Sequence, residues 1–334
     1  MSARPKVALI GAGSMGSLHA RVLSQSDRVD FAVLVEQREE VGKEIADRYG
    51  AAYAPSIDGL AGIDAVVIAA ATEAHYDIAK QVLELGKPLL VEKPLAATYA
   101  QSEELVTESE RRGLPLVCGF LERFNPAIMT AMQFVGEVVQ INAMRHSPFV
   151  PRIKTGVASD LLIHDVDLAI RFIGEEPAAV KGSFGYFNPQ SKANQSEDSA
   201  DATMSFPGGA LATISASRIS QRKVRQISVL ELDRLIEIDL LRRDITIYRH
   251  VADSPAADGV GYKQQTVIEL PTILQSAEPL AAQLNHFLNL MELGAGSDEV
   301  RKERAAILPA HRVVHEATVS TGNGHVAAVP AGAS

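Results

Sequence analysis

The sequence predicts an α/β protein with two domains: a doubly wound parallel sheet, then an α+β domain on an open, mainly antiparallel sheet. Strand and helix patterns alternate over about the first 120 residues, which is typical of a parallel sheet. After a helical pattern at 160–173, strand-like runs follow one another with only turn residues between them, as in an antiparallel sheet. We expect the first domain to cover residues 1–121 and the second 122–330.

The strands of the first domain are short apolar runs, as expected for strands covered on both faces. They span residues 6–10, 31–35, 65–70, 89–91 and 114–118. Amphipathic patterns between them predict helices at 39–49 and 73–85. Gly86 is placed to end the second of these helices, and Thr98 with Gln101 forms a capping box that begins a third.

The second domain continues from the helical pattern at 160–173 into six strand-like runs. These runs are AAVKGSFGYF, ADATMSFPG, ALATISASRI, VRQISVLEL, RLIEIDL and DITIYR. Residues 188–199 and 252–261 are rich in polar and small residues and predict exposed loops. Two further helical patterns follow: one begins near residue 276, and the other covers residues 298–320.

The composition argues against several classes of protein. Hydrophobic residues make up 46% of the chain, yet no run of about 18 uncharged apolar residues predicts a membrane span. A formal net charge of −9 without a basic run argues against nucleic-acid binding. Cys118 is the sole cysteine, so no internal disulfide is expected. The first strand pattern starts close to Met1, which leaves no room for a targeting peptide, and we expect a cytoplasmic protein.

Gly11, Gly13 and Gly16 form a G-x-G-x-x-G motif directly after the first strand and at the start of a helical pattern. In this context the glycines permit a tight turn, close approach of a pyrophosphate to the backbone, and close packing of helix on strand. The N–H groups at the start of the helix would face the anion. The motif therefore predicts a Rossmann domain that binds a dinucleotide.

Glu36 follows the second strand, 20 residues after Gly16. A carboxylate at this position can accept hydrogen bonds from the ribose hydroxyls and would repel a 2′-phosphate. Arg38, two residues further on, would soften that preference. We therefore expect NAD as the cofactor and regard NADP as the less favoured one.

The segment SDLLIHDVD opens a helix that is apolar nearly all round. At about 100° per residue, Asp160, His164, Asp167 and Arg171 fall on one narrow stripe, and Asp165 stands apart from it. Three interpretations remain open. The stripe consists of a helix cap, an Asp167–Arg171 ion pair and a core histidine; or it contributes metal ligands; or Asp160 orients His164 as a general base.

A second motif, VEKPL, follows the fourth strand, at the sheet edge where doubly wound proteins bind ligands. Lys93 in such a crevice can hydrogen-bond a substrate hydroxyl or act as a base if it is desolvated. The Lys93–Pro94 bond is a candidate cis peptide. Glu-Lys-Pro by itself is equally compatible with a turn that carries a surface lysine.

Together these residues resemble the Gfo/Idh/MocA oxidoreductases, from about Lys6 to Val329. GAGSMGSLHA resembles the family's opening motif, VEKPLA its most specific motif, GFLERFNPAI the segment that leaves the nucleotide domain, and DLLIHDVD its D-x-x-x-H dyad. The resemblance implies catalytic roles for Lys93 and His164 and a supporting role for Asp160. It also implies a homodimer or homotetramer, because in the family a second subunit covers the open sheet.

Thr72 and His75 lie where the family lines the cofactor, although Glu73 replaces a proline often found there. The glycine pair usual ahead of the dyad is reduced to Gly156. The expected cofactor-binding residues are Gly11, Gly13, Ser14, Met15, Gly16, Glu36, Arg38, Ala70, Thr72, His75, Glu92 and Lys93.

Within the family, the stretch from ERFNPAI to DLLIHDVDL is most similar to dehydrogenases that oxidise the C3 hydroxyl of UDP-N-acetylglucosamine or its uronic acid. Arg145, Arg152 and Lys154 precede the dyad and would receive a diphosphate or carboxylate; the alternative is a solvated basic loop. The expected substrate-binding residues are Lys93, Arg123, Asn125, Arg145, Arg152, Lys154, Asp160 and His164, and no residue is assigned to a metal.

The function expected from the sequence is NAD-dependent oxidation of a secondary ring hydroxyl, at C3, in an amino sugar or nucleotide sugar. An inositol or an aminoglycoside-type amino sugar is an alternative substrate, and reduction of a 3-ketosugar is the alternative direction. Two other classes remain: a non-catalytic NAD-binding regulator, which would need neither Lys93 nor His164, and a metal-dependent lyase or hydrolase.

Overall fold

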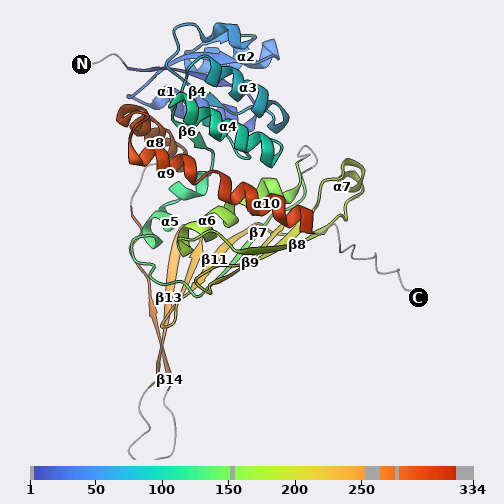
Figure 1. Ribbon diagram of the computed structural model, residues 1–334, viewed down its shortest axis with the longest axis vertical. Coiled ribbons are helices and arrows are strands. Elements are labelled where there is room, and N and C mark those ends of the chain that lie inside the picture. Colours follow the sequence, from blue (N-terminus) through green and yellow to red (C-terminus); the bar gives the residue numbers. More distant parts are fainter. Residues whose placement is uncertain (1–3, 151–154, 253–263, 275–277, 321–334) are drawn as a thin grey trace, which may run out of the picture. The chain divides into compact units, whose positions relative to one another are not determined.

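The computed structural model describes residues 4–150, 155–252, 264–274 and 278–320, and these form two compact units. The described residues within 4–134 and 272–311 make up the first unit, and those within 135–271 and 312–320 make up the second. Figure 1 shows both units and labels most of their helices and several of their strands.

The first unit is built on a six-stranded parallel sheet in the order β3-β2-β1-β4-β5-β6. Its strands are β1 (Lys6–Ile10), β2 (Asp30–Val35), β3 (Ala52–Ala54), β4 (Ala65–Ile68), β5 (Leu89–Val91) and β6 (Leu116–Cys118). They are connected by α1 (Ser14–Gln25), α2 (Glu39–Tyr49), η1 (Ile57–Leu60), α3 (Thr72–Glu84) and α4 (Tyr99–Arg112). This is the doubly wound order, so the predicted Rossmann sheet is confirmed.

Local signals account for several ends of these elements. The Gln101 N–H donates to the Thr98 hydroxyl at 3.2 Å, and the Thr98 N–H donates to the Gln101 side chain at 3.2 Å, so the predicted capping box is present. Gly86 has φ of +71°, the left-handed conformation expected just after α3. Strand β3 was not predicted, because this edge strand reads Ala-Tyr-Ala and lacks the buried apolar run that marks β5, Leu-Leu-Val.

Four later elements also belong to the first unit, whereas the sequence placed the domain boundary after residue 121. They are η2 (Leu121–Phe124), α5 (Pro126–Ala131), α8 (Pro279–Leu293) and α9 (Asp298–Ala305). Phe287 of α8 and Val300 of α9 lie in the same buried core as Val7 and Leu9 of β1. Packing between segments far apart in the sequence therefore extends this unit beyond its contiguous N-terminal stretch.

The second unit is an eight-stranded sheet in the order β14-β13-β12-β11-β7-β10-β9-β8. Strands β7 and β10 pair in parallel and the other neighbours are antiparallel, so the predicted mainly antiparallel sheet is confirmed. The strands are β7 (Gln140–His146), β8 (Ala179–Gly185), β9 (Ser199–Ser205), β10 (Leu211–Ser217), β11 (Val224–Leu230), β12 (Leu235–Asp239), β13 (Asp244–Ala252) and β14 (Gln264–Glu269). The helical elements are η3 (Ala158–Leu162), α6 (Ile163–Ile173), α7 (Pro189–Asn194) and most of α10 (Leu308–Ser320), whose first four residues belong to the first unit.

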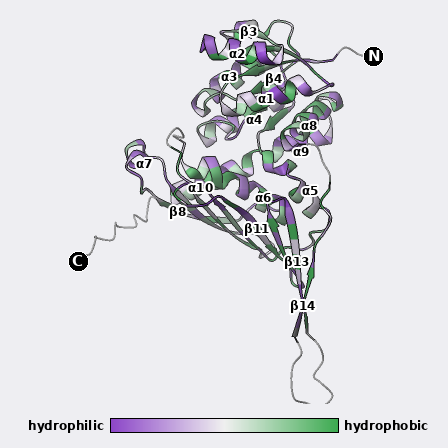
Figure 2. Ribbon diagram, turned by 180° about the vertical axis from the view of Figure 1, so that it is seen from behind, coloured by the Kyte–Doolittle hydropathy of each residue, from purple (hydrophilic) through white to green (hydrophobic). Residues whose placement is uncertain are grey.

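One face of this second sheet is covered by helices. Along β7, Ile141, Ala143 and Arg145 are buried, while Asn142 and Met144 are exposed on the opposite face. Helix α6 packs on β7 and β10, and α6 and α10 lie on the same side of the sheet in Figure 2. The alternation of side chains along β7 therefore turns a charged residue, Arg145, toward the covered face.

Residues 188–199, predicted as a loop, contain helix α7. Asn188 caps it by accepting the Gln190 N–H at 2.9 Å, and Pro189 occupies the first helical position. The other predicted loop, 252–261, lies outside the described residues from position 253 onward.

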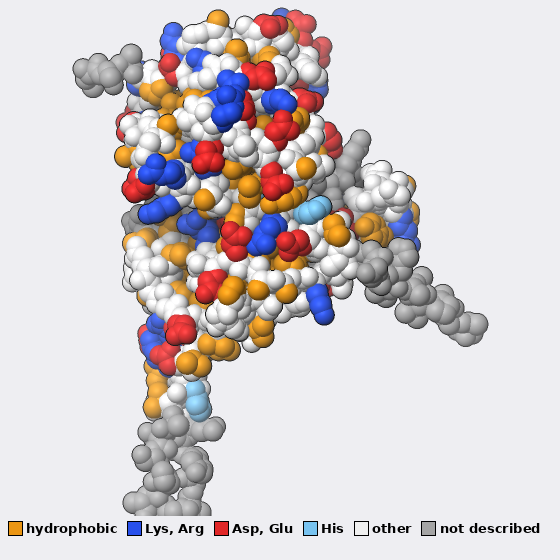
Figure 3. All heavy atoms as spheres, viewed as in Figure 1, with side chains coloured by type: hydrophobic (Ala, Val, Ile, Leu, Met, Phe, Trp, Pro, Cys, Tyr) orange, Lys and Arg blue, Asp and Glu red, His pale blue; other side chains and the backbone are white. Residues whose placement is uncertain are grey.

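On the face of the molecule in Figure 3, Lys and Arg side chains are interspersed with Asp and Glu.

Candidate active site

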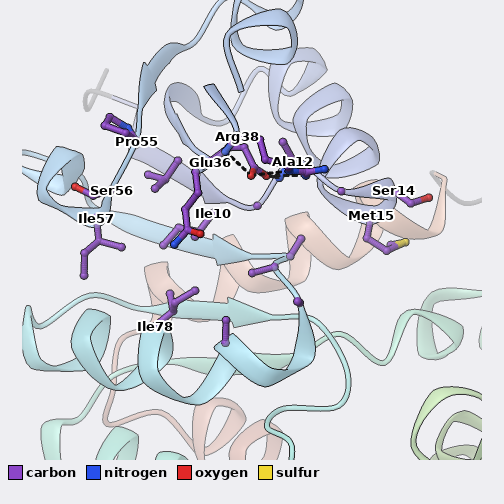
Figure 4. Close-up of a pocket in the computed structure, with 18 of the residues that line it drawn as sticks. Ile10, Ala12, Ser14, Met15, Glu36, Arg38, Pro55, Ser56, Ile57 and Ile78 are labelled. Carbon is purple, nitrogen blue, oxygen red and sulfur yellow. Dashed lines mark hydrogen bonds and ion pairs between the residues drawn. The ribbon is translucent and has the colours of Figure 1, made fainter. Parts of the chain in front are cut away.

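A cleft of about 730 Å³ lies at the carboxyl edge of the first unit's sheet (Figure 4). The β1–α1 turn, the end of β2 and the β4–α3 turn border it, so it opens where the winding of the sheet reverses between β1 and β4. The predicted cofactor residues that line it are Gly11, Gly13, Ser14, Met15, Glu36, Arg38 and Ala70. Lining residues that were not predicted include Pro55, Ser56, Ile57, Ala74 and Ile78.

The three glycines of the motif differ in what surrounds them. Gly11 has φ of +101°, and a Cβ there would lie 2.6 Å from the Ala69 carbonyl oxygen. A Cβ on Gly16 would lie 2.1 Å from the Gly11 oxygen, so α1 could not pack this close to the turn. A Cβ on Gly13 would meet no protein atom within 4 Å, although Gly13 lines the cleft. Gly13 therefore leaves room for a group that approaches the backbone at the start of α1, which fits a dinucleotide pyrophosphate.

Glu36 accepts four hydrogen bonds at the end of β2. Its Oε2 accepts the Ala12 N–H at 2.8 Å and Arg38 Nη2 at 3.0 Å, and its Oε1 accepts the Arg38 N–H and Nε at 3.0 Å each. Burial raises the pKa of Glu36, but these hydrogen bonds outweigh it and lower the pKa to about 2. The usual pKa of a glutamate is 4.5, so the ionised Glu36 side chain contributes its full stabilisation of the fold above about pH 4.5. This stabilisation is lost as the pH falls toward 2.

We expect the Glu36–Arg38 pair to set the cofactor preference. The Arg38 side chain is 62% exposed, and its rotation toward solvent would release two of the four hydrogen bonds on the carboxylate for ribose hydroxyls. Glu36→Ala is expected to raise the ratio of kcat/KM for NADP to that for NAD by about tenfold or more, because it removes the repelling charge and leaves Arg38 to meet a 2′-phosphate. Arg38→Ala is expected to lower the ratio. Initial rates with both cofactors measure it, and an unchanged ratio in Glu36→Ala would show that another residue sets the preference.

His75 and Thr72 are not among the residues that line the cleft. Thr72 begins α3, and His75 is only 1% exposed. The His75 Nδ1 lies 2.9 Å from the Pro94 oxygen, and its Nε2 lies 3.1 Å from the Ala70 oxygen. His75 thus links the turn that carries Ala70 to the turn after β5, and it supports the cleft from inside the fold rather than lining it.

Lys93 follows β5 at the same carboxyl edge of the sheet, and its bond to Pro94 is cis, as the sequence predicted. Glu92 is 6% exposed; its Oε1 lies 2.8 Å from His19 Nε2, and its Oε2 accepts the Lys93 N–H at 3.3 Å. The Glu92 side chain therefore ties the backbone of Lys93 to α1, the helix that starts at the cleft. His19 had no role in the sequence prediction, although it lies within GSMGSLHA.

Arg123 and Asn125, which the sequence predicts to bind substrate, make contacts within the first unit. Arg123 is 8% exposed, donates to Glu303 at 3.0 Å and to the Ala306 oxygen at 2.8 Å, and stacks on the Phe120 ring. Asn125 is 4% exposed and caps α5 by accepting the Ala127 N–H at 3.1 Å. Both side chains are committed to contacts within the first unit.

Asp160 and His164 of the dyad lie where the chain makes one π-helical turn and continues into α6. The Ile163 N–H donates to the Ala158 oxygen, a bond from residue i+5 to residue i. The single α-helical stripe predicted from Asp160 to Arg171 assumed about 100° per residue, and a π turn advances by less. Asp160 Oδ2 accepts a hydrogen bond from Arg218 Nη2 at 3.3 Å. Turns of this kind occur frequently at functional sites.

The structure gives Arg145, one of the predicted diphosphate ligands, a buried partner that the sequence did not indicate. Arg145 Nε donates to Asp165 Oδ2 at 2.8 Å and Nη2 donates to Oδ1 at 2.7 Å, and the two residues are 2% and 1% exposed. Strand β7 turns Arg145 toward the helices, and α6 turns Asp165 toward the strand. A diphosphate-binding role for Arg145 stays a prediction. Arg152 and Lys154 lie outside the described residues.

Two residues near the dyad were missed from the sequence. Arg218 is 58 residues from Asp160, and Glu197 is 39 residues from Ala158, whose N–H it accepts at 2.8 Å. Neither belongs to a motif, and no spacing in the sequence marks them. Only the pairing of strands brings them to the dyad.

Within the described ranges, no three His, Cys, Asp or Glu side chains are grouped so that they could hold a metal ion. Among the helices of those same ranges, none combines the length and the apolar composition needed to cross a membrane.

A doubly wound parallel sheet, with a glycine turn and an acid bordering the cleft between β1 and β4, defines a dinucleotide-binding domain. The chain belongs to the Gfo/Idh/MocA oxidoreductase family. Residues 5–120 match the family's NAD-binding Rossmann-fold model, and residues 129–231 match a model of the Gfo/Idh/MocA C-terminal domain.

Relatives of this chain include dehydrogenases of a nucleotide sugar and of inositols. The UDP-N-acetylglucosamine 3-dehydrogenase of Acidithiobacillus ferrooxidans is 30% identical over 85% of this chain and 88% of its own length. The inositol 2-dehydrogenase of Rhizobium meliloti is 27% identical over 63% of this chain and 68% of its own. A solved structure of the Acidithiobacillus enzyme superposes with a TM-score of 0.81 at 25% identity, covering 95% of this chain and 98% of that one. The protein is thus an oxidoreductase with an NAD-binding domain, in a family that includes sugar and polyol dehydrogenases.

Proposed function

We propose that the protein is an NAD-dependent dehydrogenase that oxidises a secondary ring hydroxyl, at C3, of an amino sugar or nucleotide sugar to a ketone. One observation carries the proposal: Lys93 follows β5 at the same sheet edge that holds the glycine cleft, and Glu92 ties its backbone to α1. A lysine at that edge has the chemistry to bind the oxygen of an alcohol that is being oxidised.

In the proposed reaction, His164 accepts the proton of the hydroxyl group and Asp160 supports it. Lys93 donates a hydrogen bond to the same oxygen and stabilises its alkoxide character. NAD supplies the acceptor for the hydride that leaves the ring carbon. Lys93 as the base is the variant of this scheme, and the reverse reaction, reduction of a 3-ketosugar, uses the same residues. These roles rest on the family resemblance of the two motifs.

A substrate without a diphosphate is the second candidate, and the Arg145–Asp165 pair favours it. Arg145 was one of three cations expected to meet a diphosphate, and its guanidinium is bound by a buried carboxylate. The inositol 2-dehydrogenase relative supports the same alternative. An inositol or an aminoglycoside-type amino sugar would need hydroxyl and amine recognition in place of phosphate recognition.

The test is absorbance at 340 nm with NAD and a panel of UDP-N-acetylglucosamine, its uronic acid, free inositols and an aminoglycoside. Reduction of NAD with a nucleotide sugar alone would establish the first candidate, and reduction with an inositol or aminoglycoside alone would establish the second. The reverse direction is tested with NADH and the corresponding ketosugar. Wild-type protein that binds NAD tightly but turns over no sugar in either direction would instead favour an NAD-binding regulator.

We also propose a homodimer or homotetramer, since the face of the second sheet opposite α6 exposes Met144 and Leu211 among polar residues. Cytoplasmic localisation remains a prediction from the sequence.

A further inference from the structure

A cluster of charged residues lies at one end of the second sheet, beside the dyad. Ser217, the last residue of β10, pairs with both Ser199 of β9 and His146 of β7. Arg218 directly follows that position, and Glu197 lies just before β9. The register of three neighbouring strands therefore brings these side chains to the same end of the sheet.

Both the backbone and the side chain of Arg218 are hydrogen-bonded at this end of the sheet. Its N–H donates to the Asp198 oxygen at 2.9 Å, and the residue is 3% exposed. Its Nη2 donates to Asp160 Oδ2 at 3.3 Å, while the Asp160 side chain keeps 22% of its surface exposed. The Arg218 guanidinium is thus buried, and the Asp160 carboxylate that it contacts remains accessible. In this arrangement the buried guanidinium can orient the accessible carboxylate.

Glu197 fixes the backbone that leads into the dyad. Its Oε1 accepts the Ala158 N–H at 2.8 Å, and its carbonyl accepts the Val157 N–H at 3.2 Å. A Cβ on Gly156 would lie 2.1 Å from Glu197 Oε2, so the single glycine ahead of the dyad is the residue that allows this contact. Burial raises the pKa of Glu197, and the Ala158 N–H and the charge of Arg218 oppose that rise.

The π turn explains why the dyad needs support from the sheet. In a regular α-helix, Asp160 and His164 would be i,i+4 neighbours on one face. The turn over Ala158–Leu162 alters that relation, so the helix alone does not fix the direction of the Asp160 carboxylate. Contacts made by Glu197, just before β9, and by Arg218, just after β10, orient this segment.

We propose that Arg218 is a positioning residue that holds the Asp160 carboxylate in its working orientation, with Glu197 clamping the backbone of residues 156–158. The inference rests on the proposed function, because it assigns Asp160 to the substrate site. Arg218 acts on the reaction only through Asp160.

The kinetic test compares Arg218→Met and Arg218→Lys with wild type, using a sugar that wild type oxidises. Arg218→Met is expected to lower kcat/KM for the sugar by about 100-fold, because misplacing a supporting group costs about that much, and to leave the NAD dissociation constant unchanged. Arg218→Lys keeps the charge and is expected to recover part of the loss. Arg249→Met is the matched control, since Arg249 also contacts two carboxylates of the second unit, Asp233 and Glu269, on its surface.

A second measurement needs no turnover. Amide hydrogen exchange of a peptide covering residues 156–164 is expected to be about tenfold faster in Arg218→Met than in wild type, and unchanged in Arg249→Met. Equal exchange in the Arg218 and Arg249 variants overturns the proposal, as does an Arg218→Met enzyme within threefold of wild type. If wild type oxidises no sugar, the proposed function fails, and the exchange comparison alone decides whether Arg218 holds the segment. Should Arg218→Met fold poorly, Arg218→Lys and Glu197→Gln carry the same comparison.

Discussion

Lys93→Ala and His164→Ala are each expected to lower kcat/KM for the sugar by about 10²–10⁴-fold while leaving NAD binding nearly unchanged. Lys93 is not among the residues that line the glycine cleft, and His164 belongs to the second unit. Their loss should therefore affect the chemical step and spare the dinucleotide. Initial rates at 340 nm measure the first quantity, and calorimetric titration with NAD measures the second.

Two control variants separate this result from general damage. Lys43→Ala on α2 and His250→Ala on β13 remove exposed residues of the same types and should keep wild-type rates. In the proposed scheme Lys93 and His164 act on one oxygen atom. The kcat/KM of the double variant should therefore be only slightly lower than that of the less active single variant. Retention of activity within about threefold in both single variants would place the chemistry on other residues.

Arg145→Met is expected to lower the free energy of unfolding of the second unit by about 3–5 kcal/mol, because it leaves Asp165 as a buried carboxylate without its guanidinium. Both side chains are 2% exposed and are joined by two parallel hydrogen bonds. Urea unfolding followed by circular dichroism measures the shift, with hydrogen exchange of β7 peptides to identify the unit that responds.

The double variant Arg145→Met/Asp165→Leu provides the internal control. Replacing both charges by apolar side chains removes the cost of an isolated buried ion, so it should be more stable than Arg145→Met alone. Arg249→Met breaks surface ion pairs and is expected to leave the midpoint nearly unchanged. A double variant as unstable as the sum of its single variants would contradict this account. Sugar turnover by the same proteins would show whether Arg145 also matters for the substrate.

The first unit was largely predictable because its signals are short-range. Gly11, Gly13 and Gly16 mark a turn whose geometry only glycine allows at two of the three positions, and Glu36 follows the next strand. Apolar strand runs separated by amphipathic helices report burial on both faces of a sheet. Such patterns depend on neighbours within a few residues, and the structure matches them.

The second unit was predictable in class and not in its contacts. An α-helical stripe placed Asp160, His164 and Asp167 together and left Asp165 aside; the structure adds a π turn at Ala158–Leu162 and shows that Arg145 binds Asp165. A change of one hydrogen bond, from i+4 to i+5, alters which side chains share a face, and composition carries no signal for it.

The sequence by itself determined the fold class, the dinucleotide turn, the acid that follows β2 and the family, since each depends on residue types at fixed local spacings. Only the tertiary structure decided that Arg145 pairs with Asp165, that Arg123 contacts Glu303 and Ala306, and that Arg218 and Glu197 contact Asp160 and Ala158. These contacts depend on which distant segments pack together: a strand and a helix for Arg145, two helical elements for Arg123, and neighbouring strand ends for Arg218 and Glu197. A buried charge takes the partner that such packing brings within reach, and no local spacing in the sequence marks that partner.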